Sequence, residues 1–238
     1  MTPMIRFDDA RDLADLATFL GRAARVEEGA VRLQAAGEAL AVWVPVLRPQ
    51  TILDDSPVVI GLRVMRASVD GAPDTDAPDG QIDVTVPVRA VLDRLARVGD
   101  EARTILVPPD RVREAWAAVS PPRGGWRRIA EVDSTELARV AETGIDDVAK
   151  AVPSELGTAL VERVRTETWT RPLPGTGLDD DDAPVAGVAF AAHALGFLVE
   201  PEPVALSASA GWLRLSLRRG HVLSRARRVE RLAHPSHG

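Results

Sequence analysis

The sequence predicts an α+β fold, with an antiparallel sheet in the N-terminal half packed by helices, a helical middle and a small C-terminal β meander. Two observations predict this order. Four apolar runs of strand length lie between residues 31 and 86, and the short connections between them favour antiparallel pairing. Three more such runs lie between residues 204 and 224, after a long stretch in which apolar residues recur at helical spacing.

The first expected element is a helix over residues 8–25, because leucines and alanines recur there on one helical face and aspartates occupy its beginning. The second of the strand-like runs is apolar on both faces, which indicates a strand that is covered on both sides. The four N-terminal strands are expected at residues 31–35, 40–47, 58–67 and 82–86.

Prolines mark the start of two helices in the middle of the chain, since the first position of a helix does not need the N–H that proline lacks. We expect one helix to begin at Pro87 and another to cover Pro109–Val119. Asp133 followed by Glu136 resembles a capping box and predicts a helix that ends near Gly144.

The run Val185–Leu198 is apolar on all sides, which is typical of a central buried helix. A helix over Glu155–Trp169 precedes it. The three closing strands are expected at residues 204–207, 212–217 and 221–224.

The expected organisation is one compact unit or two closely packed halves that divide near residue 100. Residues 1–100 would hold the antiparallel sheet with its flanking helices. Residues 101–226 would form a mostly helical half with the C-terminal β element, and residues 227–238 a basic tail.

Composition limits the function classes. The chain is 45% apolar and 27% charged, ordinary values for a soluble globular protein. It has no cysteine, which excludes disulfides, zinc–thiolate sites and a cysteine nucleophile. No secretory signal opens the sequence, and its longest apolar run is shorter than the roughly 20 residues that span a bilayer. We therefore expect a cytoplasmic protein with no membrane partner.

The C-terminal residues differ in charge from the rest of the chain. Residues 211–238 hold seven arginines and one acid, a net charge of +6, and because the whole chain carries −6, residues 1–210 carry −12. A basic tail on an acidic body suggests an anionic partner or a tail that folds onto its own body. Nucleic-acid binding is one hypothesis, but aromatic residues make up only 4% of the chain and its pI is near 5.3, so we favour a solvated or internally paired tail.

The turn at residues 121–126 is the first candidate ligand site. Glycines at 124 and 125 let the backbone approach a ligand closely, Arg123 can bind an anion, and Trp126 offers a flat ring. The alternative is a glycine turn that ends a helix, with the tryptophan as a core anchor. The candidate residues of this loop are Arg123, Gly124, Gly125 and Trp126.

Two histidines are the remaining candidates. His193 in the apolar run would be a general base or metal ligand in a pocket, or else a neutral core histidine, which we favour because no carboxylate lies at helical spacing from it. His221 follows a glycine turn that contains Arg219, so the two could form an anion site; the alternative is a hairpin turn with solvated arginines.

No metal site or cofactor is expected. The run Asp179–Asp182 contains the oxygen ligands that a hard cation needs, but consecutive aspartates point in different directions and no calcium-binding loop spacing follows. The sequence also lacks the glycine-rich phosphate loops, the nucleophile elbow and the zinc-protease motif.

Several runs together carry a family resemblance: Val44–Leu47, Pro121–Trp126, Ala191–Leu198 and Gly220–Leu223. In these runs the chain resembles a group of uncharacterised conserved proteins of high-GC Gram-positive bacteria, the actinobacteria. The resemblance would extend over most of the chain. It implies a bacterial cytoplasmic setting and no particular chemistry.

Three functional hypotheses remain. The first is a non-enzymatic binding or regulatory protein of the cytoplasm, because the catalytic signatures are missing from the sequence. The second is an enzyme that acts on an anionic small molecule through Arg123, Trp126 and a histidine. The third is a nucleic-acid-associated protein that uses the arginine-rich tail.

Overall fold

The computed structural model describes residues 2–49, 56–70, 81–118, 120–151 and 158–225. The expected basic tail at residues 227–238 lies outside this part of the chain. The chain forms two compact units, each treated separately below. The first unit consists of Met1–Val46, Ile60–Ser120 and Ala194–Gly196, and the second of Leu47–Val59, Pro121–His193 and Phe197–Gly238.

The first unit is an antiparallel sheet with two helices. Its elements are β1 (Met4–Phe7), α1 (Ala10–Val26), β2 (Ala30–Ala36), β3 (Ala39–Leu47), β4 (Val59–Asp70), β5 (Ile82–Pro87), α2 (Val88–Leu95), β6 (Thr104–Leu106) and α3 (Ala115–Ala118). The strand order is β5-β2-β3-β4, with β1 paired to β4 and β6 paired to β1.

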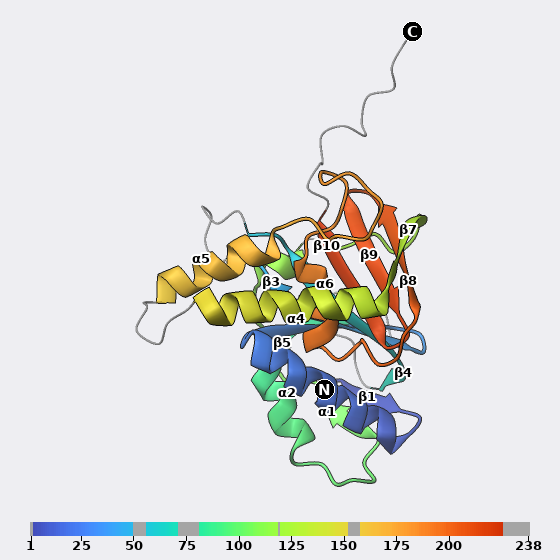
Figure 1. The fold of residues 1–238 in the computed structure, drawn as a ribbon. Coiled ribbons are helices and arrows are strands. Elements are labelled where there is room, and N and C mark those ends of the chain that lie inside the picture. The colour runs from blue at the N-terminus through green and yellow to red at the C-terminus, as the bar shows by residue number, and fades with distance from the viewer. Residues whose placement is uncertain (1, 50–55, 71–80, 119, 152–157, 226–238) are drawn as a thin grey trace. The chain divides into compact units, whose positions relative to one another are not determined.

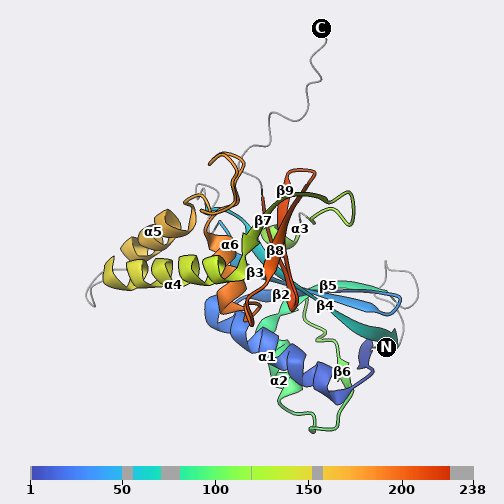
Figure 2. The same cartoon turned by 45° about the vertical axis from the view of Figure 1, so that its right-hand side comes forward.

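The core of the first unit lies between the sheet and helices α1 and α2, which Figures 1 and 2 show on one face of β2 and β5. Helix α1 begins at its N-cap Asp9, whose carboxylate accepts a hydrogen bond from the backbone N–H of Arg11 at 2.8 Å. The buried stripes of the two helices meet alternate residues of the strands. These buried residues include Leu13, Leu16, Phe19, Leu20, Val31, Leu33, Val84, Val86 and Val91.

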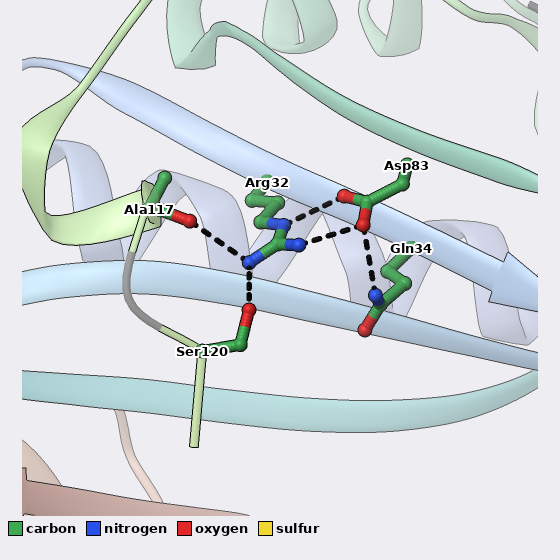
Figure 3. Close-up of polar contacts among 5 residues, drawn as sticks. All are labelled: Arg32, Gln34, Asp83, Ala117 and Ser120. Carbon is green, nitrogen blue, oxygen red and sulfur yellow. Dashed lines mark hydrogen bonds and ion pairs between the residues drawn. The ribbon is translucent and has the colours of Figure 1, made fainter. Parts of the chain in front are cut away.

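An arginine on the opposite face of this sheet binds the segment that follows β6 (Figure 3). Arg32 forms a bidentate ion pair with Asp83, in which both N–O distances are 2.6 Å. Its third nitrogen donates to the carbonyl of Ala117 at 2.9 Å and to the hydroxyl of Ser120 at 2.6 Å. Gln34 donates to the same carboxylate. The arginine therefore holds the end of the first unit on the sheet.

The second unit is a sheet with three helices. Its elements are β7 (Arg127–Asp133), α4 (Ser134–Ala151), α5 (Thr158–Trp169), α6 (Gly187–Ala194), β8 (Pro203–Ser209), β9 (Trp212–Leu217) and β10 (Gly220–Arg225). The strand order is β10-β9-β8-β7, and every pair in it is antiparallel. Figure 2 shows α4, α5 and α6 on the same side of these strands.

The α+β fold class is confirmed. The four N-terminal strands, the helix after Pro87 and the C-terminal meander lie where the sequence predicts them. Two strands were not predicted. β1 and β6 have only four and three residues, too few for a period-two pattern to stand out, and they pair with each other across the sequence.

The prediction of a helix over Pro109–Val119 is wrong for most of this range. Only Ala115–Ala118 is helical. Before it, the backbone N–H of Val112 donates to the carbonyl of Thr85 on β5, and Arg32 binds the end of the segment. These tertiary hydrogen bonds replace the helical ones that proline and the apolar spacing would favour.

Helix α4 does not end at Gly144, as the sequence predicts, but continues to Ala151. The glycine serves packing instead. A Cβ atom at this position would lie 2.4 Å from the ring of Trp169 on α5. The missing side chain therefore lets the tryptophan ring approach the axis of α4.

The central apolar helix is shorter than the predicted Val185–Leu198. Helix α6 spans Gly187–Ala194, and five of its eight residues are buried. Gly196 ends it with a left-handed φ of 72°. Phe197 is fully buried beyond this turn, so it does not share a helical face with Phe190.

The chain passes between the two units at several points, and the passage nearest the middle of the sequence falls at Ser120–Pro121 rather than near residue 100. The reason is tertiary pairing. β6 pairs with β1, the N–H of Val107 donates to the carbonyl of Pro3, and Arg32 binds Ser120. Residues 101–120 therefore belong to the first unit.

Candidate functional site

The sheet of the second unit carries arginines and tryptophans on the face opposite its leucine-rich core. Alternation along β9 places Trp212, Arg214 and Ser216 on this face. The register then sets His221 opposite Ser216 and Arg225 opposite Trp212. We call this set the arginine–tryptophan face; its residues are Trp126, Trp212, Arg214, Ser216, His221 and Arg225.

Arg214 is the central group of this face. Its guanidinium carbon lies 4.3 Å from the centre of the Trp126 ring, a cation–π contact. Its Nε atom is buried and has no hydrogen-bond partner, and none of the described carboxylates forms an ion pair with it. Burial lowers the pKa of the guanidinium, which nonetheless stays charged. The site therefore holds a partly buried cation without a counter-ion among the described residues.

His221 lies on the neighbouring strand. Its Nδ1 atom is 3.2 Å from the hydroxyl of Ser216. Burial, and to a smaller extent the charge of Arg214, lower its pKa below 6.5. The imidazole is therefore neutral at pH 7 and has a hydroxyl rather than a carboxylate as its hydrogen-bond partner.

Arg225 provides a second cation on the same face. Its guanidinium carbon lies 5.2 Å from the centre of the Trp212 ring. The arginine is exposed, whereas only 2% of Trp212 is exposed. The tryptophan ring therefore packs against the guanidinium of the arginine and is almost inaccessible to a ligand.

The structure separates the residues of the predicted ligand loop. Trp126 donates its indole N–H to the carbonyl of Pro122 at 3.2 Å and places its ring on Arg214. The carbonyl of Gly124 accepts from the Ser209 hydroxyl at 3.1 Å. Gly125 has a φ of 73°, as the glycine turn requires. Arg123 is exposed in the loop.

Of the other predicted site residues, only His221 joins the face. His193 is exposed at the last turn of α6, so the expectation of a core histidine is wrong. Five of the eight residues of α6 are buried, and His193 lies on the side of the helix that reaches solvent. Arg219 is exposed in the turn between β9 and β10.

A cavity of about 670 Å³ lies at the tip of the β8–β9 hairpin. It mixes apolar surface with one arginine and two aspartates. Its lining residues are Gly125, Arg127, Ile129, Leu178, Asp181, Asp182, Ala208, Ser209, Ala210, Gly211, Trp212 and Leu213. Gly125 and Trp212 therefore connect the predicted ligand loop, the arginine–tryptophan face and this cavity.

Sequence reasoning missed Arg214, Trp212 and Arg225 as members of a site, because it counted the two arginines only as tail charge. A signal was present: tryptophan, arginine and serine alternate with leucines along β9. That period predicts a single polar face. The contact with Trp126, however, joins distant parts of the sequence and has no local pattern.

Two further searches concern the described part of the chain only. No group of three or more histidine, cysteine or acidic side chains there is arranged to hold a metal ion. No helix there is long and apolar enough to cross a membrane.

Comparison with solved structures identifies the class of fold. The DNA polymerase sliding clamp from Caulobacter crescentus is 15% identical, with a TM-score of 0.50, and the match covers 94% of this chain and 65% of the clamp. A DnaN sliding clamp from Bartonella birtlesii, solved with griselimycin, is 12% identical, with a TM-score of 0.53 and the same two coverages. A putative DNA polymerase III beta subunit from Eubacterium rectale is 7% identical, with a TM-score of 0.53, covering 98% of this chain and 66% of that one.

The chain therefore has a fold similar to that of sliding clamps, although it spans less than two thirds of the length of these clamp chains. Two family models match it in sequence. Both are described as domains of unknown function, DUF8010 over residues 1–118 and DUF8185 over residues 121–229. The break between them coincides with the boundary of the two units. None of the curated proteins matches the sequence.

Proposed function

We propose that this protein is a non-enzymatic binding protein that uses a sliding-clamp-like fold to dock other proteins. The observation that carries this proposal is the likeness to sliding clamps over 94% of the chain. The arginine–tryptophan face, with its partly buried cation, is the surface that the proposal assigns to docking.

We place the protein in the bacterial cytoplasm, the location that its resemblance to actinobacterial proteins implies. An enzyme is the weaker hypothesis, because His221 has a hydroxyl partner and the described residues offer it no carboxylate to orient the ring.

Association with DNA is a second candidate, since the matching solved structures are DNA polymerase sliding clamps and the C-terminal residues are basic. The charge of the helices argues against association with DNA. Helices α1, α2, α4 and α5 together contain nine basic and nine acidic residues. The chain as a whole carries −6. These helices therefore offer no concentration of positive charge that could neutralise a series of phosphates.

The test compares the two candidates in one protein sample. Full-length protein is titrated into labelled duplex and single-stranded oligonucleotides at about 50 and about 200 mM salt, and phosphate binding must weaken steeply between the two. In parallel, chemical cross-linking in actinobacterial lysate, with and without nuclease, identifies bound proteins.

Protein cross-links that survive nuclease and are lost in an Arg214→Gln, Arg225→Gln double variant support the proposal. Salt-sensitive binding to oligonucleotides, with all cross-links abolished by nuclease, would replace it with the DNA hypothesis. Turnover of an anionic small molecule by the purified protein would contradict the non-enzymatic assignment.

A further inference from the structure

The starting observation is an unsatisfied arginine. Arg214 is half-buried, its Nε atom is shielded from solvent, and no acceptor reaches that atom. A charged group that loses water without gaining a partner is unfavourable. The aromatic contact with Trp126 compensates only in part, because it supplies no hydrogen-bond acceptor. An incoming carboxylate would supply both the charge and the acceptors.

A second cation lies at a defined spacing from the first. Arg225 stands opposite Trp212, and Trp212 is two residues before Arg214 on β9. The two arginines are therefore diagonal neighbours on one face, with a separation of roughly 7–8 Å. Alternate side chains of an extended peptide lie about 6.6 Å apart and point to the same side. The two spacings match within the reach of an arginine side chain.

The surroundings of these arginines do not already neutralise them. Besides the two arginines, the residues that share the face on β8, β9 and β10 are uncharged. On β7 the register places Glu131 and Asp133 on the same face; Glu131 pairs with Arg128, and Asp133 accepts hydrogen bonds from Thr135. Other arginines nearby are occupied: Arg128 pairs with Glu131, and Arg218 with Glu200 and Glu202.

We propose that the arginine–tryptophan face binds an extended acidic segment of a partner protein, with carboxylates at alternate positions, one on Arg214 and one on Arg225. This inference rests on the proposed docking function and specifies the chemistry of the partner.

A protein segment fits this face better than a nucleic acid does. Single-stranded nucleic acids need a row of cations and several exposed aromatic faces. Among the described residues of this face, Arg214 and Arg225 are the two arginines without a described acidic partner, Trp212 is 2% exposed, and one side of the Trp126 ring is occupied by Arg214. The net charge of −6 also opposes a long polyanion more than it opposes a segment with two carboxylates.

The experiment uses fluorescence anisotropy with full-length protein and two labelled peptides of equal composition. In the first, two glutamates alternate with serine; in the second, the two glutamates are adjacent, so that an extended chain points them to opposite sides. A short thymidine oligonucleotide is the third probe. We expect tightest binding of the alternating peptide. Arg214→Gln and Arg225→Gln should each weaken it roughly tenfold, the effect of losing one charge-assisted hydrogen bond.

Arg163→Gln is the matched control, because Arg163 is an exposed arginine on α5 in the same unit, and it should leave the affinity unchanged. Circular dichroism checks that each variant is folded; Arg225 is exposed, so its variant remains informative even if Arg214→Gln disturbs the sheet. Equal affinity for the two peptides, unchanged affinity in both variants, or preferential binding of the oligonucleotide would overturn the inference. If the peptides fail but nuclease-resistant protein cross-links persist, the docking function stands and only this acidic ligand is wrong.

Discussion

At the residue scale, the arginine–tryptophan face shows how one cation affects its neighbours. Arg214 contacts the ring of Trp126 and, through its charge, helps to keep His221 neutral. The larger cause of the lowered histidine pKa is burial on β10. The two effects can be separated, because a substitution at the arginine removes the charge and leaves the strand in place.

We expect Arg214→Gln to raise the pKa of His221 toward its ordinary value of 6.5 without reaching it, since burial remains. NMR titration of the imidazole measures this change. An unchanged His221 titration would show that the arginine charge does not reach the ring.

The same lowered pKa gives a pH dependence of stability. Because His221 binds its proton more readily in the unfolded chain, the folded state loses stability as the pH falls from about 6.5 through the lower pKa of the folded protein. Above that window this histidine contributes no pH dependence. Urea unfolding at a series of pH values measures the free energy of unfolding. In wild type this free energy should fall as the pH is lowered through this window, and in His221→Gln it should fall less. An identical pH dependence in the two proteins would contradict the role of His221.

At the element scale, glycines and one arginine determine how helices and segments pack. Gly144 lets Trp169 reach α4, and Trp169 in turn stacks on Phe190 of α6 with ring centres 4.7 Å apart. In the first unit, Arg32 connects β2 to the segment before Ser120. These contacts act between elements, so their substitutions test packing rather than local propensity.

Gly144→Ala should destabilise the protein by about 1–3 kcal/mol, because the new methyl group would lie 2.4 Å from the Trp169 ring and this overpacking exceeds the gain in helix propensity. The control is Gly21→Ala in α1, where nothing lies within 4 Å of the added atom. There we expect a gain of about 0.5–1 kcal/mol. Urea denaturation measures the change in the free energy of unfolding for each variant. A change of the same sign for both substitutions would refute the packing argument.

Arg32→Ala should release the segment over residues 110–120 from the first sheet. Hydrogen exchange at the amide of Val112, which donates to the carbonyl of Thr85, is expected to accelerate. Arg89→Ala, at an exposed arginine on α2 with a pairing distance of 3.6 Å to Asp93, should leave that exchange rate unchanged. Equal protection in wild type and Arg32→Ala would show that the hydrogen bonds of Arg32 to Ala117 and Ser120 do not hold the segment.

At the scale of the whole molecule, net charge controls behaviour in solution. The chain carries −6 at pH 7 and its pI is near 5.3. Repulsion between copies should therefore keep the protein soluble at neutral pH and fade as the pH approaches the pI. Light scattering across this range should show the greatest self-association near pH 5.3, and a maximum at neutral pH would contradict the expectation.

The sequence by itself determined the type and order of most elements. The alternating runs that became β2, β5 and β9 and the apolar stripe of α1 are local patterns, because period two and period 3.6 follow from backbone geometry. The glycine turn at 124–125 was also predictable, since only a few residue types adopt a positive φ easily. Charge counts marked the basic C-terminal residues but could not say which arginines share a face.

Tertiary structure decided the rest. Residues 109–114 are not helical; Val112 instead donates a hydrogen bond to Thr85 of β5. Gly144 is a packing position inside α4 and not its end. The candidate site was decided in the same way. Trp126 meets Arg214 only because β7, β8 and β9 pair side by side, and burial of an arginine without a carboxylate depends on which strands pair, information that no single stretch of sequence holds.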